Sequence, residues 1–179
     1  EFREQIMSAR SSEIDARITI LLQRLDKIIE AHDFPQALSD ALKIKRIYPD
    51  NPRVEKLDQY VREAQESYKH QIERDFLAAA QKDDVDGAIA LLKELDAYLT
   101  EREAEPFREV ARGVIGKKRD NLGVQFKMAV HDKEWLKSIR VGEQIIRDFP
   151  NTRMAEEVRE RIDLLRERAA GQQAAQQSR

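Results

Sequence analysis

The stretch HDFPQALSDALKIKRIYPDN, residues 32–51, combines a turn, a short amphipathic segment and a proline stop. Asp33 is suited to cap a helix N-terminus, where its carboxylate accepts from a free backbone N–H, and Pro35 is suited to the first turn. Pro49 ends the helix, because the residue before a proline is disfavoured in helical conformation. The apolar residues between recur at the spacing of one helix face: Phe34, Ala37, Leu38, Ala41, Ile44 and Tyr48. The stretch predicts a short helix over 34–48.

The same pattern occurs twice more, displaced by 51 and then by 50 residues. The small residue Ala37 corresponds to Ala88 and then to Ser138. The remaining apolar positions are Val85, Ile89, Leu92, Leu95 and Leu99 in the second copy, and Trp135, Ile139, Ile145 and Phe149 in the third, where Gly142 also takes one. In the second copy Thr100, followed by Glu103, has the spacing of a capping box. Three copies at one spacing are typical of a repeat architecture.

These copies resemble helix B of a tetratricopeptide repeat, which has an aromatic residue three positions before a small residue and a proline twelve after it. The matches are Phe34, Ala37 and Pro49 in the first copy, Ala88 in the second, and Trp135, Ser138 and Pro150 in the third. In the second copy Val85 replaces the aromatic residue and Thr100 the proline. The resemblance covers only this half of the repeat. Leu21, Arg24 and Leu25 stand where helix A of the family has a large aromatic, a leucine and a glycine, and the spacing is near 50 instead of about 34 residues.

Long segments follow the first two short helices, from Arg53 to about Gln81 and from Glu103 to about Val130. Each carries apolar residues at steps of three and four and would form a helix about 42 Å long. We expect the first half of each long helix to cover the preceding short helix and its second half to cover the next. Glycines within 112–123 predict a kink or break in the second long helix, or else a close helix approach, since each weakens a helix interior by up to about 1 kcal/mol.

The predicted fold is therefore all-α, a tetratricopeptide-like array of about seven antiparallel helices with no sheet. We expect helices near 11–31, 34–48, 52–81, 84–99, 102–130, 133–149 and 151–170, with residues 1–10 able to extend the first. They would form one domain over 1–170, with copies near 11–60, 61–111 and 112–170. Gly171 is a plausible helix stop, which leaves residues 171–179 as a polar tail.

Composition narrows the function classes. The 32 basic and 34 acidic residues nearly cancel, so the chain has no long-range attraction for nucleic acid or an anionic membrane. The absence of cysteine excludes disulfides and thiol chemistry. The longest apolar runs are too short to span a bilayer, so we expect no direct membrane insertion by this segment. Cytoplasmic and periplasmic locations are equally allowed.

Each group of residues that could bind a metal, catalyse a reaction or contact phosphate also has an ordinary structural explanation. His32 and His131 each precede an aspartate and could be paired ligands, but histidines that face helix C-terminal carbonyls are the favoured interpretation. The carboxylate pair Asp83–Asp84 belongs to a solvated, capping surface. The basic run 117–119 could contact phosphate, but is followed by an aspartate and is interpreted as surface. We therefore predict no catalytic residue, no cofactor and no metal.

Three function classes remain after these considerations. The favoured one is a non-catalytic scaffold or adaptor that binds a protein partner on its helical surface. The alternative is a structural or oligomerising rod, a homo-oligomer that could be the soluble part of a larger or membrane-anchored protein. An enzyme is the least supported. Tyr60, Tyr98 and Arg24 are the candidate partner-binding residues, because aromatic and arginine side chains most often dominate interfaces. Trp135 is expected to fill the core.

Overall fold

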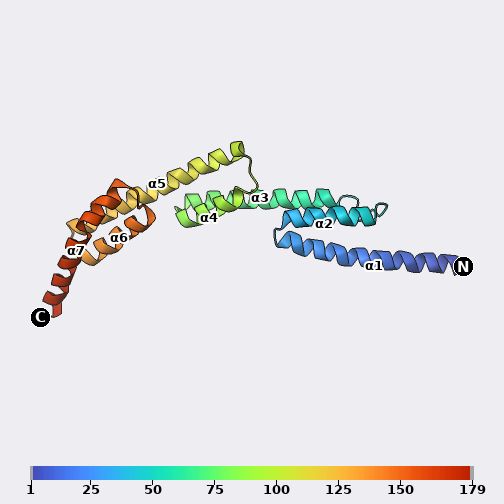
Figure 1. The fold of residues 1–179 in the computed structure, drawn as a ribbon, viewed down its shortest axis with the longest axis horizontal. Coiled ribbons are helices and arrows are strands. Elements are labelled where there is room, and N and C mark those ends of the chain that lie inside the picture. The colour runs from blue at the N-terminus through green and yellow to red at the C-terminus, as the bar shows by residue number, and fades with distance from the viewer. Residues whose placement is uncertain (1, 178–179) are drawn as a thin grey trace. The chain divides into compact units, whose positions relative to one another are not determined.

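A computed structural model describes residues 2–177 and contains seven helices and no strand within that range. They are α1 (Phe2–Glu30), α2 (Phe34–Ile47), α3 (Leu57–Gln81), α4 (Val85–Leu95), α5 (Glu101–His131), α6 (Trp135–Asp148) and α7 (Arg153–Gln177) (Figure 1). The all-α prediction is confirmed for this range. The chain divides between Arg74 and Asp75 into two units, so the boundary lies inside α3, and each unit is described by itself.

In the first unit, α2 turns back along the C-terminal half of α1 (Figure 1). Burial on α1 begins at Ile18, which is 0% exposed, whereas every residue from Phe2 to Arg17 is exposed. The core of this unit consists of apolar side chains from all three helices and the loop before α3: Ile18, Leu25, Phe34, Ala37, Ala41, Ile44, Val54, Leu57, Val61 and Ile72. The N-terminal half of α1 therefore has no part in that core.

In the second unit, the long helix α5 packs on both neighbouring short helices, α4 and α6, and α6 packs on α7. Phe76 and Phe107 meet edge to face with ring centroids 5.7 Å apart, next to the buried Ala88 and Ala111. A larger cluster joins α5, α6 and α7: Leu122, Phe126, Val141, Ile145, Ala155, Val158, Ile162 and Leu165. The expectation that a long helix covers the short helices on both sides is met by α5.

The turns before α2, α4 and α6 share one backbone geometry. His32, Asp83 and Lys133 have positive φ angles of 60°, 56° and 60°. In each turn the following residue donates its N–H to the carbonyl five positions earlier: Asp33 to Ile28 (3.2 Å), Asp84 to Ala79 (3.0 Å) and Glu134 to Ala129 (2.9 Å). This is the hydrogen-bond pattern of a Schellman motif, which ends a helix at a left-handed residue. The three turns are 51 and 50 residues apart.

The small residues of the three short helices are all buried. Ala37, Ala88 and Ser138 are 0%, 1% and 0% exposed. The hydroxyl of Ser138 donates to the Trp135 carbonyl at 2.8 Å, which satisfies its polar group inside the core. Their burial agrees with the prediction that these positions face neighbouring helices.

The predicted end of α7 was wrong, whereas the option that residues 1–10 extend the first helix is confirmed for residues 2–10. α1 begins at Phe2 instead of residue 11, because residues 2–10 contain helix-compatible side chains and no proline or glycine. α7 continues through Gly171 to Gln177. One glycine costs a helix only about 1 kcal/mol, and the surrounding alanines and glutamines favour the helix. The last two residues of the expected tail lie outside the described range.

Two further boundaries differ from the prediction. α3 begins at Leu57, not near 52, because Asn51 organises residues 51–57 as successive turns. Its side chain accepts from the Arg53 N–H at 3.0 Å and its carbonyl from Val54 at 3.1 Å. α4 ends at Leu95, not near 99, and the Tyr98 N–H donates to the Leu95 carbonyl in the turn that follows.

The glycines of α5 do not break it, because the helix runs unbroken from Glu101 to His131. A Cβ at Gly113 or Gly116 would meet nothing within 4 Å, so neither serves a close approach. A Cβ at Gly123 would lie 2.7 Å from the sulfur of Met154, so Gly123 does allow a close approach between helices. Packing of α5 on two neighbouring helices offsets the weakening that the glycines cause.

Candidate functional site

Tyr60 is an exposed residue of α3, with 49% of its surface accessible. Its hydroxyl donates to Asp26 Oδ1 on α1 at 3.1 Å. This hydrogen bond, followed by partial burial and the negative charge of Asp26, raises the pKa of Tyr60. The ring lies beside a hollow of about 570 Å³ whose walls include Leu22, Leu25 and Pro52. Tyr60 is therefore available to a partner but held in place by α1.

Arg24 is exposed on α1 and lines a second hollow, of about 240 Å³, against α2. Ile44 and Ile47 form the α2 side of that hollow. Leu25 lines both this hollow and the one beside Tyr60. The structure thus brings two of the three predicted partner-binding residues into one unit, on either side of the same buried leucine.

Tyr98 belongs to the second unit, in the turn that follows α4. It is half-buried, and burial, followed by the charge of Glu94, raises the pKa of its hydroxyl. Tyr98 therefore lies in a different unit from Arg24 and Tyr60 and shares no site with them inside one unit.

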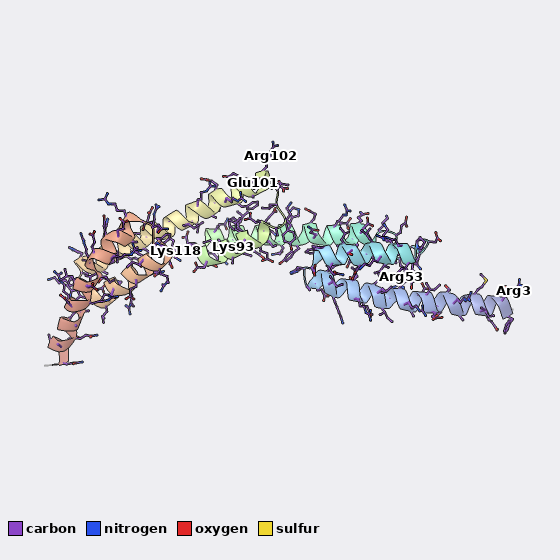
Figure 2. All side chains as sticks on the ribbon, viewed as in Figure 1. Arg3, Arg53, Lys93, Glu101, Arg102 and Lys118 are labelled. Carbon is purple, nitrogen blue, oxygen red and sulfur yellow. The ribbon has the colours of Figure 1, made fainter. Side chains whose placement is uncertain are left out.

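A groove beside the α2–α3 loop was not anticipated from the sequence. It has a volume of about 520 Å³ and is lined by Met7, Arg10, Ser11, Ile14 and Asp15 of α1 and by residues 48–52. Arg53 ties this loop to α1, because its guanidinium donates to the Asp15 carbonyl (3.2 Å) and to the Thr19 hydroxyl (3.0 Å) (Figure 2). The signal that could have found the groove is the apolar spacing of α1, which continues from Leu25 back to Met7.

The basic run on α5 is engaged in ion pairs within the second unit. Lys117 Nζ lies 2.7 Å from Asp83 Oδ2. Lys118 lies between α4 and α6, 3.6 Å from Asp86 and 3.3 Å from Asp148 (Figure 2). Carboxylates therefore oppose both lysines, which weakens any attraction for phosphate and supports the interpretation as surface.

His32 and His131 each precede an aspartate, but they occupy different positions in their turns. His32 occupies the left-handed position of its turn, whereas His131 is the last residue of α5, two positions before the corresponding Lys133. The His32 ring stacks on Tyr68 with centroids 3.6 Å apart. Within residues 2–177, no three His, Asp or Glu side chains gather as a metal site would require.

Trp135 packs against the buried cluster of the second unit, as expected for the aromatic residue of the third copy. The Arg168 guanidinium lies over its ring, 5.1 Å from the centroid. Along the described part of the chain, no helix combines the length and apolarity needed to cross a membrane. Comparisons with protein-family models, with curated proteins and with solved structures gave no significant match.

Proposed function

We propose that the chain is a tetratricopeptide-like helical repeat array that acts, without catalysis, as a scaffold or adaptor for a protein partner. The observation that carries the proposal is the recurrence of one turn and one buried small residue at the same spacing. The left-handed residues 32, 83 and 133 and the buried residues 37, 88 and 138 are both 51 and 50 positions apart. Repeated local geometry together with repeated burial is what a repeat architecture requires.

Burial on the long helices supports the same scheme. Val54, Val61 and Ile72 in and before α3 correspond, 50 residues later, to Ala104, Ala111 and Leu122 of α5, and all six are buried. A further 51 residues on, Ala155 and Ile162 of α7 take the places of Ala104 and Ala111, and both are buried. Of these long helices, α5 packs on α4 and α7 packs on α6, which supports the same scheme.

Parts of α1 and α7 carry polar residues where the matching positions of the other copies are apolar and buried. Arg3 and Arg10 of α1 stand at the positions of Val54 and Val61 in the next copy. At the other end, the positions of Leu122 and Phe126 correspond to glutamines 173 and 177 of α7. At these positions the copies therefore differ, because a polar side chain replaces a buried apolar one.

Binding to a protein partner is supported by the apolar side chains that remain on the surface. Ile47 and Tyr60 of the first unit are 63% and 49% exposed, and Met128 and Leu136 of the second are 59% and 52% exposed. They are scattered among charged side chains, which suits an interface of modest area with a polar rim.

The test is affinity capture from the source cell with the intact chain and with the double variant Tyr60→Ala, Tyr98→Ala. We expect the double variant to recover less of a specific protein partner. Tyr60→Phe is the control for the ring, because it removes only the hydrogen bond to Asp26. Recovery of no protein, together with turnover of a small molecule or a stoichiometric bound metal in the purified chain, would overturn the scaffold proposal in favour of an enzyme.

A second candidate, an oligomerising rod, is favoured by one observation. The N-terminal half of α1 is exposed throughout, and Phe2, Ile6, Met7 and Ile14 lie on it. Exposed apolar side chains on one helix are a common site of self-association. The mass in solution at increasing concentration decides between the candidates: a monomer at all concentrations excludes the rod.

A further inference from the structure

The apolar face of α1 that packs against α2 continues beyond the end of α2. Ile18, Leu21 and Leu25 belong to this face, and Ile18 and Leu25 are 0% and 1% exposed. Met7 and Ile14 extend it toward the N-terminus at the same steps of three and four residues, through Ser11, and are 71% and 42% exposed. Residues at these steps share one side of a helix, so the unoccupied part of the face is shaped to receive another helix.

The α2–α3 loop forms the opposite wall of this unoccupied part. Tyr48, Pro49 and Pro52 line the groove together with Met7 and Ile14, and its volume is about 520 Å³. The loop is fixed to α1 by the two hydrogen bonds of Arg53 to the Asp15 carbonyl and the Thr19 hydroxyl. Because both walls are already ordered, little conformational entropy is lost when an occupant binds.

Charge is divided between the two flanks of the face. Arg3, Arg10 and Arg17 follow one another at intervals of seven residues and lie along one flank, and Glu4 and Asp15 lie on the other. Arg17 already pairs with Glu13 at 2.7 Å, so Arg3 and Arg10 are the arginines that this flank offers to a partner. Residues 2–17 contain three arginines and three carboxylates, so this helix half has no net attraction for an anionic membrane. A partner helix, in contrast, meets each flank separately and can match the arginine side with acidic residues.

A second copy of α1 fits the face less well. Antiparallel pairing would set the arginine flank of one helix against the arginine flank of the other. Parallel pairing would place Arg10 near Asp15 of the partner, but the shared seam would contain only Met7, Ser11 and Ile14, with a serine at its centre. That is about one heptad, fewer than the three or four that a coiled coil needs.

Resting on the proposed scaffold function, we propose that this groove is the docking site for an amphipathic helix of a partner protein. The apolar stripe of that helix packs on Met7 and Ile14 beside the proline-containing loop, and acidic residues along one of its edges face Arg3 and Arg10. The interaction is a helix-in-groove contact of small area.

The direct test uses two labelled synthetic helical peptides of about five turns. They share one leucine stripe and differ only in whether glutamates or lysines flank it. Fluorescence anisotropy with the intact chain should show at least about tenfold tighter binding of the glutamate peptide. Ile14→Glu and Met7→Glu should each weaken that binding about tenfold or more, because a charge would enter the apolar contact. Arg10→Glu should shift the preference toward the lysine peptide.

Leu164→Glu is the matched control, since Leu164 is 49% exposed on α7 in the other unit. It should leave binding unchanged, and circular dichroism should show unaltered helix content for every variant, because all the substituted positions are exposed. Equal affinity for the two peptides, or binding that Ile14→Glu does not weaken, would overturn the proposal. Concentration-dependent dimerisation lost in Ile14→Glu, or binding to vesicles of anionic phospholipid lost in that variant, would also overturn it, in favour of a second copy or a membrane.

The captured native partner separates this proposal from the scaffold proposal. If the intact chain and the Ile14→Glu variant retain the same partner equally, the groove assignment fails while the scaffold function stands. If neither retains any protein, the scaffold function itself fails. Loss of the partner from Ile14→Glu alone, together with the peptide preference, is the result expected.

Discussion

Substitution of Ala88 by leucine tests the close packing of the short helices most directly. Ala88 is 1% exposed and lies among Phe76 and Ala111, with Leu92 and Phe107 packed on the same cluster. Leucine adds three carbon atoms to a position with no free space, so neighbouring side chains must leave their preferred rotamers or the two helices must separate.

The expected cost follows from that crowding. Overpacking of a closed core destabilises a protein by about 1–3 kcal/mol. In a chain of 179 residues, each 1 kcal/mol lowers the melting temperature by about 2–4 °C, so the expected decrease is about 2–12 °C. The matched control is Ala90→Leu, because Ala90 lies on the same helix and is exposed.

Thermal unfolding followed by circular dichroism at 222 nm (the helix band), together with urea denaturation, measures the effect. Ala and Leu have similar helix propensities, so a difference between the two variants reports packing. Equal midpoints for Ala88→Leu, Ala90→Leu and the parent chain would refute the assignment of Ala88 to a helix contact. Ala37→Leu and Ser138→Leu should behave like Ala88→Leu if the three copies are equivalent.

Three further predictions follow from local features. Lys133→Gly should stabilise the chain by up to about 1 kcal/mol in urea denaturation, because Lys133 has a φ of 60° and glycine adopts that conformation without steric cost; Lys133→Ala should show no such gain. Thr100→Ala should cost about 1 kcal/mol by the same assay, since it removes the capping box with Glu103 at the start of α5, and an unchanged midpoint would contradict the role of that cap. The hydrogen bond from Lys45 lowers the pKa of Asp58 below its usual 3.8, so the stabilising effect of this pair should be present at neutral pH and lost as the pH falls through the lowered pKa. Lys45→Met should therefore reduce stability at pH 7 and leave it unchanged at the acid end of the titration, and a pH-independent difference would exclude this cause.

Helix ends could be predicted from sequence where the chain supplies its own terminating group. Asp33 accepts from the Gln36 N–H at 3.2 Å, and Thr100 and Glu103 form both bonds of a capping box. The segment before Pro49 ends its helix at Ile47. Each of these signals acts over a few residues, so no distant contact is needed to form it.

Glycine was a poorer guide than these caps. Gly113, Gly116 and Gly171 all lie inside unbroken helices. The sequence shows a glycine's weak helix propensity, about 1 kcal/mol, but not the packing or neighbouring residues that outweigh it. The tertiary structure shows Gly123 against Met154 and Gly113 against open space, which no local pattern distinguishes.

Amphipathic spacing and capping chemistry, which are local, determined that the chain is helical, where its short helices lie and which small residues are buried. Contacts between residues far apart in the sequence determined which side chains and grooves the surface presents. The hydrogen bond of Tyr60 to Asp26, the ion pairs of Lys118 to Asp86 and Asp148, and the anchoring of the α2–α3 loop by Arg53 all join separate elements. Helical periodicity tells which side of a helix is apolar, but only packing tells how far along that side a neighbour reaches. For that reason the seam from Met7 to Leu25 could be recognised as one face, whereas its division into a buried half under α2 and an open groove beside Pro49 and Pro52 depends on where α2 ends in space.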